Sequence, residues 1–273
     1  MQQLTKTPRK TKKTKEVQEV TEVIEVTEVI ERTENNVSMS NTVARSSHEL
    51  RLGEKRLICS ALASLDSIRT KKLVEAHTGL GFDSCITAKD YAAHFNLDIT
   101  VAYKQMKEAC DLLFERHIRH ETMTAKGKVI HKIRWVSSAK YHEGEGWVQL
   151  RFTSEVAPHL LGLRENFTTY KLKHAAGLDT VYAWKLYELL TSWKSTGLYR
   201  VSVDEFHRIM DTPVSFRKNF KDLRMNVLEP ALERINERTD LIVQYQTVKD
   251  GRKFVRLDFA FVRDLKKNVQ QAS

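Results

Sequence analysis

Hydrophobic residues spaced three and four apart predict a helix near the start of the chain, followed by a helix-turn-helix. In the first helix, between Leu50 and Ile68, the apolar residues on one face are Leu57, Ile58, Ala61, Leu62, Leu65 and Ile68. A break follows at Gly79–Gly81. Thr87, with Asp90 three residues later, is expected to cap a short helix through Phe95, and Asp98 or Thr100 to cap a second helix. This spacing is that of a helix-turn-helix.

The hydrophobic period changes to two after the second of these helices. That helix is expected to bury Val101, Ala109, Leu112 and Leu113 and to turn Tyr103, Lys104 and Lys107 outward. Residues 129–136 then alternate, and Val148, Leu150 and Phe152 form a second alternating run across the Gly144–Gly146 turn. Helix, helix-turn-helix and β-hairpin in this order predict a winged helix.

The same order of elements returns in the second half of the chain. A helix beginning at Asp179 or Thr180 aligns Val181, Tyr182, Leu186, Leu189, Leu190 and Trp193. Ser202–Glu205 is a capping-box pattern for a short helix that ends at Asp211–Pro213. A long helix then carries Phe216, Phe220, Leu223 and Val227 on one face, with a kink or restart at Pro230. Asp250–Gly251 predicts the turn of a final hairpin.

The expected fold is therefore mainly α with small β wings, an α+β arrangement of tandem winged-helix domains at residues 39–165 and 166–273. Residues 1–38 are expected to form a low-complexity, disordered tail. Glutamate recurs there at every third position and Val20–Glu25 is repeated as Val26–Glu31, a period that segregates apolar residues on neither a helix nor a strand. A solvated extension and a partner-binding arm both fit this tail, and Met39 is a candidate alternative start.

Charge narrows the class of partner. The 273 residues include 45 Lys and Arg against 35 Asp and Glu, a net charge of +10, which favours nucleic acid or an acidic membrane surface. Acids and bases balance in residues 1–38, so the surplus belongs to the folded part. No apolar run is long enough for a membrane span or a signal peptide, so we expect a soluble cytoplasmic protein without a membrane partner. Cys59, Cys85 and Cys110 form no CxxC pair, so the cysteines predict neither a disulfide framework nor a zinc site.

Enzymatic signatures are absent from the sequence. It contains no GxxxxGK[ST] motif for nucleotide phosphates and no pair of histidines flanking one hydrophobic residue, the pattern of metal-dependent nickases. The histidines of His117–His120 have the wrong spacing for such a site. We therefore expect no catalytic activity, no cofactor and no bound metal.

Basic residues supply the candidate binding chemistry. On the helix from Phe216, the expected base-reading residues are Arg217, Lys218, Asn219, Lys221 and Arg224. An α-helix fills the major groove of DNA, where Arg pairs with guanine and Asn with adenine. Contacts with the DNA backbone are expected from Tyr103, Lys104, Lys107, Lys132, Arg134, Lys249, Arg252 and Lys253. The alternative for each set is an ordinary solvated basic face.

Three segments resemble the replication initiators of iteron-containing plasmids: Ser47–Ile58, Ala183–Leu190 and Phe216–Asn236. The resemblance extends from about residue 41 to about residue 262. It implies a bacterial cytoplasmic protein that binds double-stranded DNA at the origin repeats called iterons, promotes origin opening and helps to load the host initiator and replicative helicase. It further implies a monomer–dimer equilibrium shifted by chaperones, in which the dimer represses its own gene at an operator inverted repeat.

The resemblance also assigns roles to the two halves. The C-terminal winged helix would read bases through its second helix, and the N-terminal one would contact the DNA backbone and form the dimer interface. We assign that interface to Leu57, Ile58, Leu62 and Leu65 on the first apolar helix. The alternative function is a winged-helix transcriptional regulator without a role in replication, and an enzymatic alternative is a nicking initiator.

Overall fold

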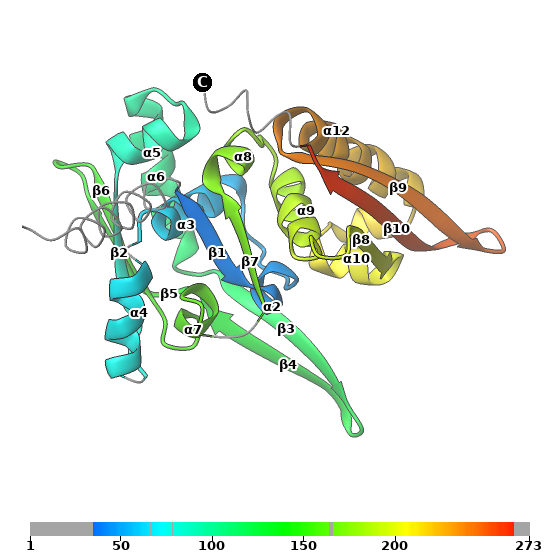
Figure 1. Ribbon diagram of the computed structural model, residues 1–273, viewed down its shortest axis with the longest axis horizontal. Helices are drawn as coiled ribbons and strands as arrows, with labels where there is room; N and C mark the ends of the chain where they lie inside the picture. Colours follow the sequence, from blue (N-terminus) through cyan, green and yellow to red (C-terminus); the bar gives the residue numbers. More distant parts are fainter. Residues whose placement is uncertain (1–34, 66, 78, 164–165, 265–273) are drawn as a thin grey trace, which may run out of the picture. The chain divides into compact units, whose positions relative to one another are not determined.

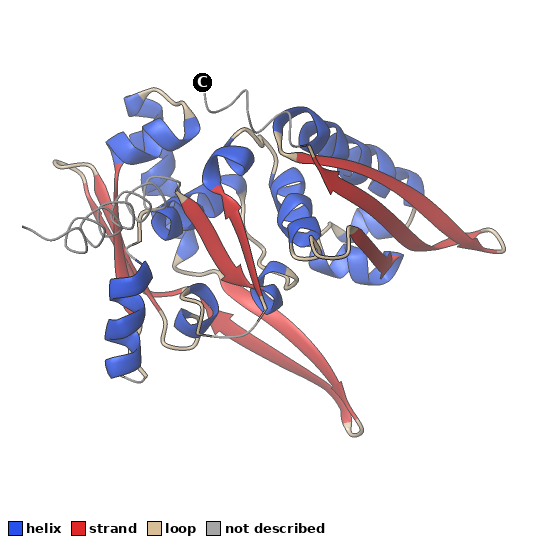
Figure 2. Cartoon of the chain, viewed as in Figure 1, coloured by secondary structure: helices blue, strands red, loops and turns tan. Residues whose placement is uncertain are grey.

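The N-terminal half contains the predicted helix-turn-helix and more β-structure than the sequence indicated (Figures 1 and 2). The computed structural model describes residues 35–65, 67–77, 79–163 and 166–264. The elements up to residue 160 are β1 Asn36–Ser40, α2 Asn41–Ala44, α3 Leu52–Ala63, α4 Ser67–Ala76, β2 Phe82–Thr87, α5 Ala88–Phe95, α6 Ile99–Leu113, β3 His117–Thr124, β4 Gly127–Arg134, β5 Val136–His142, β6 Trp147–Phe152 and α7 Ala157–Leu160.

The capping residues begin the helices of the helix-turn-helix where they were predicted. The Thr87 hydroxyl accepts a hydrogen bond from the backbone N–H of Asp90 at 3.1 Å, which starts α5. Asp98 accepts one from Thr100 at 2.8 Å, which starts α6. Between the helices, Asn96 adopts a left-handed conformation with φ 48°, which Asn tolerates better than most residues. These local contacts confirm the predicted helix-turn-helix.

Two N-terminal predictions are wrong in detail. The first apolar helix ends at Ala63, and α4 begins separately at Ser67. In α6, Val101 is 42% exposed, while Ala102, Met106 and Cys110 are buried beside the correctly predicted Ala109 and Leu113. The buried stripe repeats at three and four from Ala102, so Val101 at the first turn falls outside it.

Strand pairing also differs from the prediction. β4 pairs with β3, whereas β6 pairs with β5 across the predicted Gly144–Gly146 turn and with β2 on its other side. The outer part of the β3–β4 hairpin is exposed on both faces. The β3 sequence therefore lacks the apolar–polar alternation of a half-buried strand, which explains why the sequence pattern missed β3.

β1 brings part of the predicted tail into the fold. It pairs antiparallel with β7, Phe167–Lys171, with Val37 opposite Tyr170, and Val37 and Met39 are fully buried. Residues 36–38, expected in the tail, are therefore structural, and the repeats of residues 16–34 lie outside the described residues. The β1–β7 pair also carries the N-terminal half beyond the expected boundary at residue 165.

A chain that starts at Met39 is expected to be less stable than one that starts at Asn35. The shorter chain lacks fully buried Val37 and the β1–β7 pairing of residues 36–38. Loss of the buried valine alone predicts a free energy of unfolding lower by about 2–3 kcal/mol. Urea unfolding of both truncated chains and the full chain measures this, and equal midpoints for the two truncated chains would contradict the role of β1.

The C-terminal half has a three-stranded sheet in the order β8-β10-β9 among the described residues. Its elements after β7 are α8 Leu172–Ala176, α9 Val181–Thr191, β8 Leu198–Ser202, α10 Val203–Ile209, the 3₁₀ turn η1 Val214–Arg217, α11 Phe220–Leu223, the π-helical turn η2 Arg224–Leu228, α12 Glu229–Arg238, β9 Leu241–Asp250 and β10 Lys253–Arg263. The Thr180 and Ser202 side chains cap α9 and α10 as predicted. The predicted turn at Gly251, with φ 57°, joins β9 to β10, whereas β8 was not predicted.

The long helix predicted from Phe216 is interrupted. Asn219 is extended, and its side chain accepts a hydrogen bond from the N–H of Lys221 at 2.9 Å, so α11 starts only at Phe220. Such a side-chain contact with the backbone competes with continuation of a helix. The wider turn η2 then precedes Pro230, which lies in the first turn of α12, where its missing N–H costs no hydrogen bond. The expected restart at Pro230 is thus confirmed, but the first turn is not part of the helix.

The winged-helix order is present in both halves, but the description "mainly α" is not confirmed. Helices account for about 43% of the described residues and strands for about 32%, because β1, β2, β3, β5, β7 and β8 add to the strands predicted for the two wings. No helix in the described part of the chain is long and apolar enough to cross a membrane.

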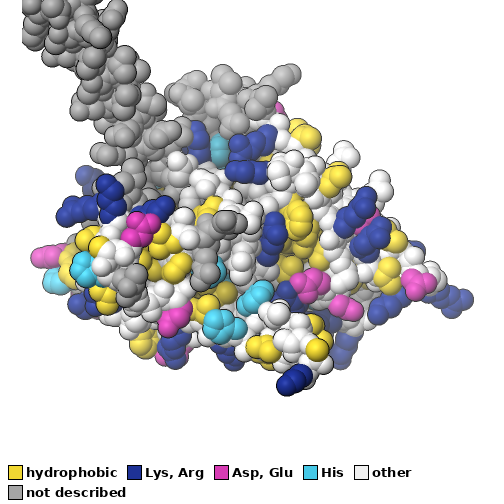
Figure 3. Space-filling view, turned by 60° about the horizontal axis from the view of Figure 1, so that its bottom comes forward, with side chains coloured by type: hydrophobic (Ala, Val, Ile, Leu, Met, Phe, Trp, Pro, Cys, Tyr) yellow, Lys and Arg dark blue, Asp and Glu magenta, His cyan; other side chains and the backbone are white. Residues whose placement is uncertain are grey.

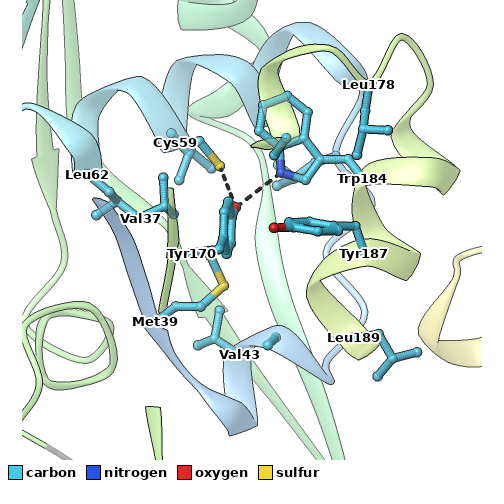
Figure 4. Packing of buried hydrophobic residues seen from close by; sticks show 14 of the residues in the cluster. Val37, Met39, Val43, Cys59, Leu62, Tyr170, Leu178, Trp184, Tyr187 and Leu189 are labelled. Carbon is cyan, nitrogen blue, oxygen red and sulfur yellow. Dashed lines mark hydrogen bonds between the residues drawn. The ribbon is translucent and has the colours of Figure 1, made fainter. Parts of the chain in front are cut away.

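The core of the N-terminal half surrounds Tyr170 and contains a buried polar cluster (Figure 4). The Tyr170 hydroxyl accepts a hydrogen bond from Nε1 of Trp184 at 3.1 Å and donates one to Glu188 at 2.5 Å. Lys55 on α3 pairs with the other carboxylate oxygen of Glu188 at 2.6 Å. The cluster therefore connects α3, β7 and α9 at the centre of the described chain.

Candidate nucleic-acid interface

All five predicted base-reading residues line one groove in the C-terminal winged helix, together with two residues of its wing. The groove has a volume of about 450 Å³. Its lining residues are Val203, Asp204, His207, Arg217, Lys218, Asn219, Phe220, Lys221, Arg224, Arg252, Lys253 and Phe254. Six of them are Lys or Arg and one is an acid, so the groove favours an anionic partner.

The second helix and the wing are held together by an aromatic contact. The rings of Phe220 on α11 and Phe254 on β10 stack with their centroids 4.1 Å apart and an interplanar angle of 18°. The ammonium of Lys249 lies 4.5 Å from the Phe254 ring centroid. Leu223 and Val227 are buried and fix the opposite side of the helix against the core. The helix and the wing thereby form two walls of the same groove.

The candidate side chains differ in the contacts that they already form within the chain. Arg217 lies on η1, and its Nη2 donates to the carbonyl of Thr212 at 3.4 Å. Arg224 pairs with Glu229 at 3.4 Å, with both side chains about half exposed, a weak contact that DNA is able to displace. Asn219 already uses its carboxamide oxygen to cap α11. This is the acceptor that pairing with adenine needs, so Asn219 has a structural role besides the predicted one.

The basic side chains of α6 are only partly available. Lys104 is exposed. Lys107 pairs with Glu143, and this hydrogen bond raises the pKa of Lys107. Tyr103 does not point freely outward as predicted, because it packs on Gly146, where a Cβ atom would lie 2.1 Å from the ring. Gly146 has φ 64° and leaves room for this ring.

The two predicted contact residues on β4 also differ. Lys132 is exposed and lies opposite Arg119 of β3. Arg134 is held against the end of α6, where its Nη1 donates to the carbonyl of Phe114 at 2.7 Å and its guanidinium lies 5.5 Å from the Phe114 ring centroid. The structure therefore unites Arg252 and Lys253 with the base-reading candidates but keeps Lys132 and Arg134 on a separate hairpin.

Asp211 connects the two halves, a role that the sequence did not indicate. Its carboxylate accepts hydrogen bonds from the Ser47 hydroxyl and from the backbone N–H groups of His48 and Glu49, at 2.9 and 3.0 Å for the latter two. The carbonyl of Ser47 in turn accepts from the N–H of Arg119 on β3 at 2.9 Å. A hydrogen-bonded route thus runs from the N-terminal hairpin to the segment just before η1. The sequence indicated Asp211 only as a helix end.

Three of the four residues predicted for the dimer interface are buried within this chain. Leu57 and Ile58 are fully buried, Leu62 is 4% exposed and Leu65 is half-buried. The helix α3 that carries the first three packs against β1, β2, α6 and α8. In this conformation Leu57, Ile58 and Leu62 stabilise the fold of one chain and offer no surface to a second copy, whereas Leu65 is partly exposed.

Lys and Arg side chains gather toward the right-hand end of the space-filling view in Figure 3, where Figure 1 places the tip of the β9–β10 hairpin. The residues at this tip, Lys249, Arg252 and Lys253, are exposed. The basic wing therefore extends the positive surface beyond the groove.

Comparison with known proteins identifies similar sequences and folds. The family described as "Initiator Replication protein, WH1" matches residues 36–191, beginning at the first residue of β1, and "Initiator Rep protein, WH2" matches residues 202–261. The PI protein of Escherichia coli is 29% identical over 250 residues, 79% of each chain. An uncharacterized 27.6 kDa protein of Escherichia coli is 26% identical over 221 residues, 80% of this chain and 92% of the other.

A solved structure has a similar fold over most of the chain. The crystal structure of Pi initiator protein in complex with iteron DNA matches with a TM-score of 0.69 and 24% identity, covering 85% of this chain and 98% of the other. At this identity the match establishes the shared fold, which is the tandem winged helix.

Proposed function

Because the chain belongs to the family of initiator replication proteins with WH1 and WH2 domains, we propose that it initiates plasmid replication by binding origin iterons. The observation that carries this proposal is the groove that unites Arg217, Lys218, Asn219, Lys221 and Arg224 with the wing residues Arg252 and Lys253. The relative crystallised with iteron DNA supports the choice of ligand.

In the proposed complex, α11 and the turn before it enter the major groove. Residues at the N-terminal end of such a helix reach the base edges. We expect Arg217 and Arg224 to pair with guanine, and Lys218 and Lys221 to contact phosphates or guanine acceptors. The wing residues Lys249, Arg252 and Lys253 contact the adjacent backbone. Specific binding then needs no catalytic step by this chain.

The N-terminal winged helix is proposed to bind the neighbouring backbone, principally through Lys104 and Lys132, which are exposed. We place the boundary between the two functional domains after α9, with the N-terminal one beginning at Asn36. Asp211 acts as a positioning residue, because its contacts with Ser47, His48 and Glu49 fix the relation of the two halves. Both domains are thereby presented to one duplex together.

The wider role follows from the family. We propose that the chain promotes origin opening in the bacterial cytoplasm and recruits the host initiator and replicative helicase. A dimer that represses its own gene at an inverted repeat, and is converted to monomer by chaperones, completes this proposal. The dimer contact uses a surface other than the buried face of Leu57, Ile58 and Leu62.

Binding to DNA from around its own gene tests the function. Purified full-length protein is titrated onto labelled duplexes that span the upstream region, with random competitor DNA at fixed, near-physiological salt. Stepwise occupancy of tandem repeats is expected for an initiator. Occupancy of only one inverted repeat would instead identify a transcriptional regulator, and equal binding to random DNA would overturn sequence-specific recognition altogether.

Changing Lys132 to Ala is expected to weaken binding to all duplexes to a similar degree. Lys132 is exposed on β4, and loss of one phosphate contact reduces the slope of log K against log salt by about one. Arg134→Ala serves as the comparison, because Arg134 lies on the same strand but already donates a hydrogen bond to the Phe114 carbonyl. Affinity is measured at several salt concentrations. An unchanged slope of log K against log salt for the Lys132 variant would show that Lys132 does not contact DNA.

A further inference from the structure

A pocket of about 340 Å³ lies where the segment before α3 meets α9 and the end of α10. It shares no lining residue with the basic groove. Leu50, Leu52, Val181, Tyr182 and Met210 supply its apolar lining. Its volume falls within the range of small-molecule sites, roughly 300–1,000 Å³. The lining residues come from both halves of the described chain.

Lys185 contributes a buried cation to this pocket. It is 6% exposed, and its ammonium donates to the carbonyl of Ser46 and to Nδ1 of His48 at 3.2 Å. Nε2 of His48 lies 2.7 Å from the Val43 carbonyl, so that nitrogen carries the ring proton and Nδ1 is left as an acceptor. Among the described residues, no carboxylate oxygen forms an ion pair with Lys185. A buried charge without a counter-charge is costly.

The two carboxylates whose charges act on Lys185 form their hydrogen bonds with other groups. Glu188 is taken by Lys55 and Tyr170, and Asp211 by the Ser47 segment. Burial, together with repulsion from Lys55 and Arg208, lowers the pKa of Lys185 to about 7 against the weaker opposing effects of Glu188 and Asp211. The N-terminus of the 12-residue helix α3 also borders the pocket through Arg51 and Leu52, where the Glu54 carboxylate caps the helix by accepting a hydrogen bond from the N–H of Arg51 at 2.6 Å. Lys185 thus forms no ion pair among the described residues, although the carboxylates of exposed Glu49 and of Asp211 also line the pocket.

We propose that this pocket binds a small organic carboxylate with an aromatic or aliphatic body. The carboxylate pairs with the ammonium of Lys185, and the body lies against Val181, Tyr182 and Met210. A hydrogen bond between two charged groups is stronger than a neutral one. Because the pocket is lined from both halves, the bound molecule ties the segment before α3 to α9 and the end of α10.

Three probes of equal size test the charge requirement. The full-length protein is titrated with 3-phenylpropionate, 3-phenylpropanol and 3-phenylpropylamine by calorimetry at pH 6.5. We expect saturable binding of one 3-phenylpropionate, at least about tenfold tighter than the alcohol, and no binding of the amine. Absence of saturable carboxylate binding, or equal affinity for the carboxylate and the alcohol, would overturn the proposal.

Repeating the titration at pH 8.5 adds a test of the ammonium. Binding of 3-phenylpropionate is expected to weaken there, because Lys185 with a pKa of about 7 has then lost its proton in the free protein. The charged groups that act on the Lys185 ammonium are Lys55, Glu188, Asp211 and Arg208. The titratable ring of His48 contacts it directly, and Glu49 and Arg51 line the same pocket. Equal affinity at both pH values would contradict the assignment to Lys185.

Three variants complete the test. Lys185→Met is expected to reduce affinity for 3-phenylpropionate by about tenfold or more, whereas Lys140→Met, a change of an exposed lysine on β5, leaves it unchanged. Val181→Phe retains every charge but fills the pocket and is expected to abolish binding. It decides the question if the Lys185 variant does not fold. Undiminished affinity in Val181→Phe would place the probe elsewhere.

Discussion

Glu188→Gln is expected to lower the free energy of unfolding by about 3–5 kcal/mol. Glu188 is fully buried, and its two oxygens bind the Lys55 ammonium at 2.6 Å and the Tyr170 hydroxyl at 2.5 Å. An amide keeps the shape but leaves the Lys55 charge buried without its counter-charge, which is the costly event. Urea unfolding at pH 7 measures the change in the free energy of unfolding. Figure 4 shows the part of this cluster around Tyr170.

The pH dependence of this loss identifies its cause. Burial alone lowers the pKa of Lys55, but Glu188 more than reverses this and holds the pKa above its ordinary value of 10.5. In the native protein this contribution is therefore fully present below pH 10.5 and is lost only as the pH rises through the folded-state pKa. In the variant, burial lowers the pKa of Lys55, so stability should increase with pH and the deficit should shrink between pH 7 and 10.5.

Two controls separate charge from packing. Glu143→Gln breaks the exposed pair with Lys107 and is expected to change stability little, because solvent screens such pairs. The double variant Lys55→Met with Glu188→Leu removes both buried charges and should recover much of the stability lost in Glu188→Gln. Two outcomes would contradict stabilisation by the buried pair. One is an equal free energy of unfolding for Glu188→Gln and the native chain, and the other is a double variant no more stable than Glu188→Gln.

Arg224→Ala is expected to weaken binding to a cognate repeat by about 1–3 kcal/mol and to relax preference at one base pair. The arginine lines the groove beside Lys221 and Arg217, and its only ion pair in the described chain is the weak contact with Glu229. A bidentate contact with guanine discriminates between bases, so random DNA should lose less affinity. Competition titrations against repeats with single base changes measure both quantities.

The matched control for this experiment is Arg151→Ala. Arg151 is also an exposed arginine with one acidic partner, Asp83, at 3.2 Å, but it lies on β6 of the N-terminal half. We expect this variant to keep its base preference. Equal losses of affinity on cognate and random DNA in the Arg224 variant would reduce Arg224 to a phosphate contact and shift base reading to its neighbours in the groove.

The structure brings the predicted base-reading residues together, although the helix that carries them differs from the prediction. The spacing of Arg217, Lys221 and Arg224 indicated one surface, and the structure places all three on one groove. The reason differs from the one expected, because Asn219 interrupts the helix and Arg217 reaches the groove from a 3₁₀ turn. The inclusion of Arg252 and Lys253 depends on the stacking of Phe220 on Phe254, residues too far apart in sequence for any periodic pattern to relate.

The sequence by itself determined the features whose causes lie within a few residues. Thr87, Asp98, Thr180 and Ser202 cap helices through contacts with backbone N–H groups two or three residues away, and Gly251 supplies the conformation that its hairpin turn requires. Net charge is likewise a property of composition. These signals therefore predicted the helix-turn-helix and hairpin order of both winged helices and favoured an anionic ligand.

Only the tertiary structure decided the contacts between distant residues. The pairing of β1 with β7, the contacts of Asp211 with Ser47, His48 and Glu49, and the burial of Leu57 join segments separated by more than a hundred positions or depend on several packed elements. An apolar helix face looks the same in sequence whether it packs inside a monomer or against a partner. Which surface it meets is fixed by the packing of the whole chain.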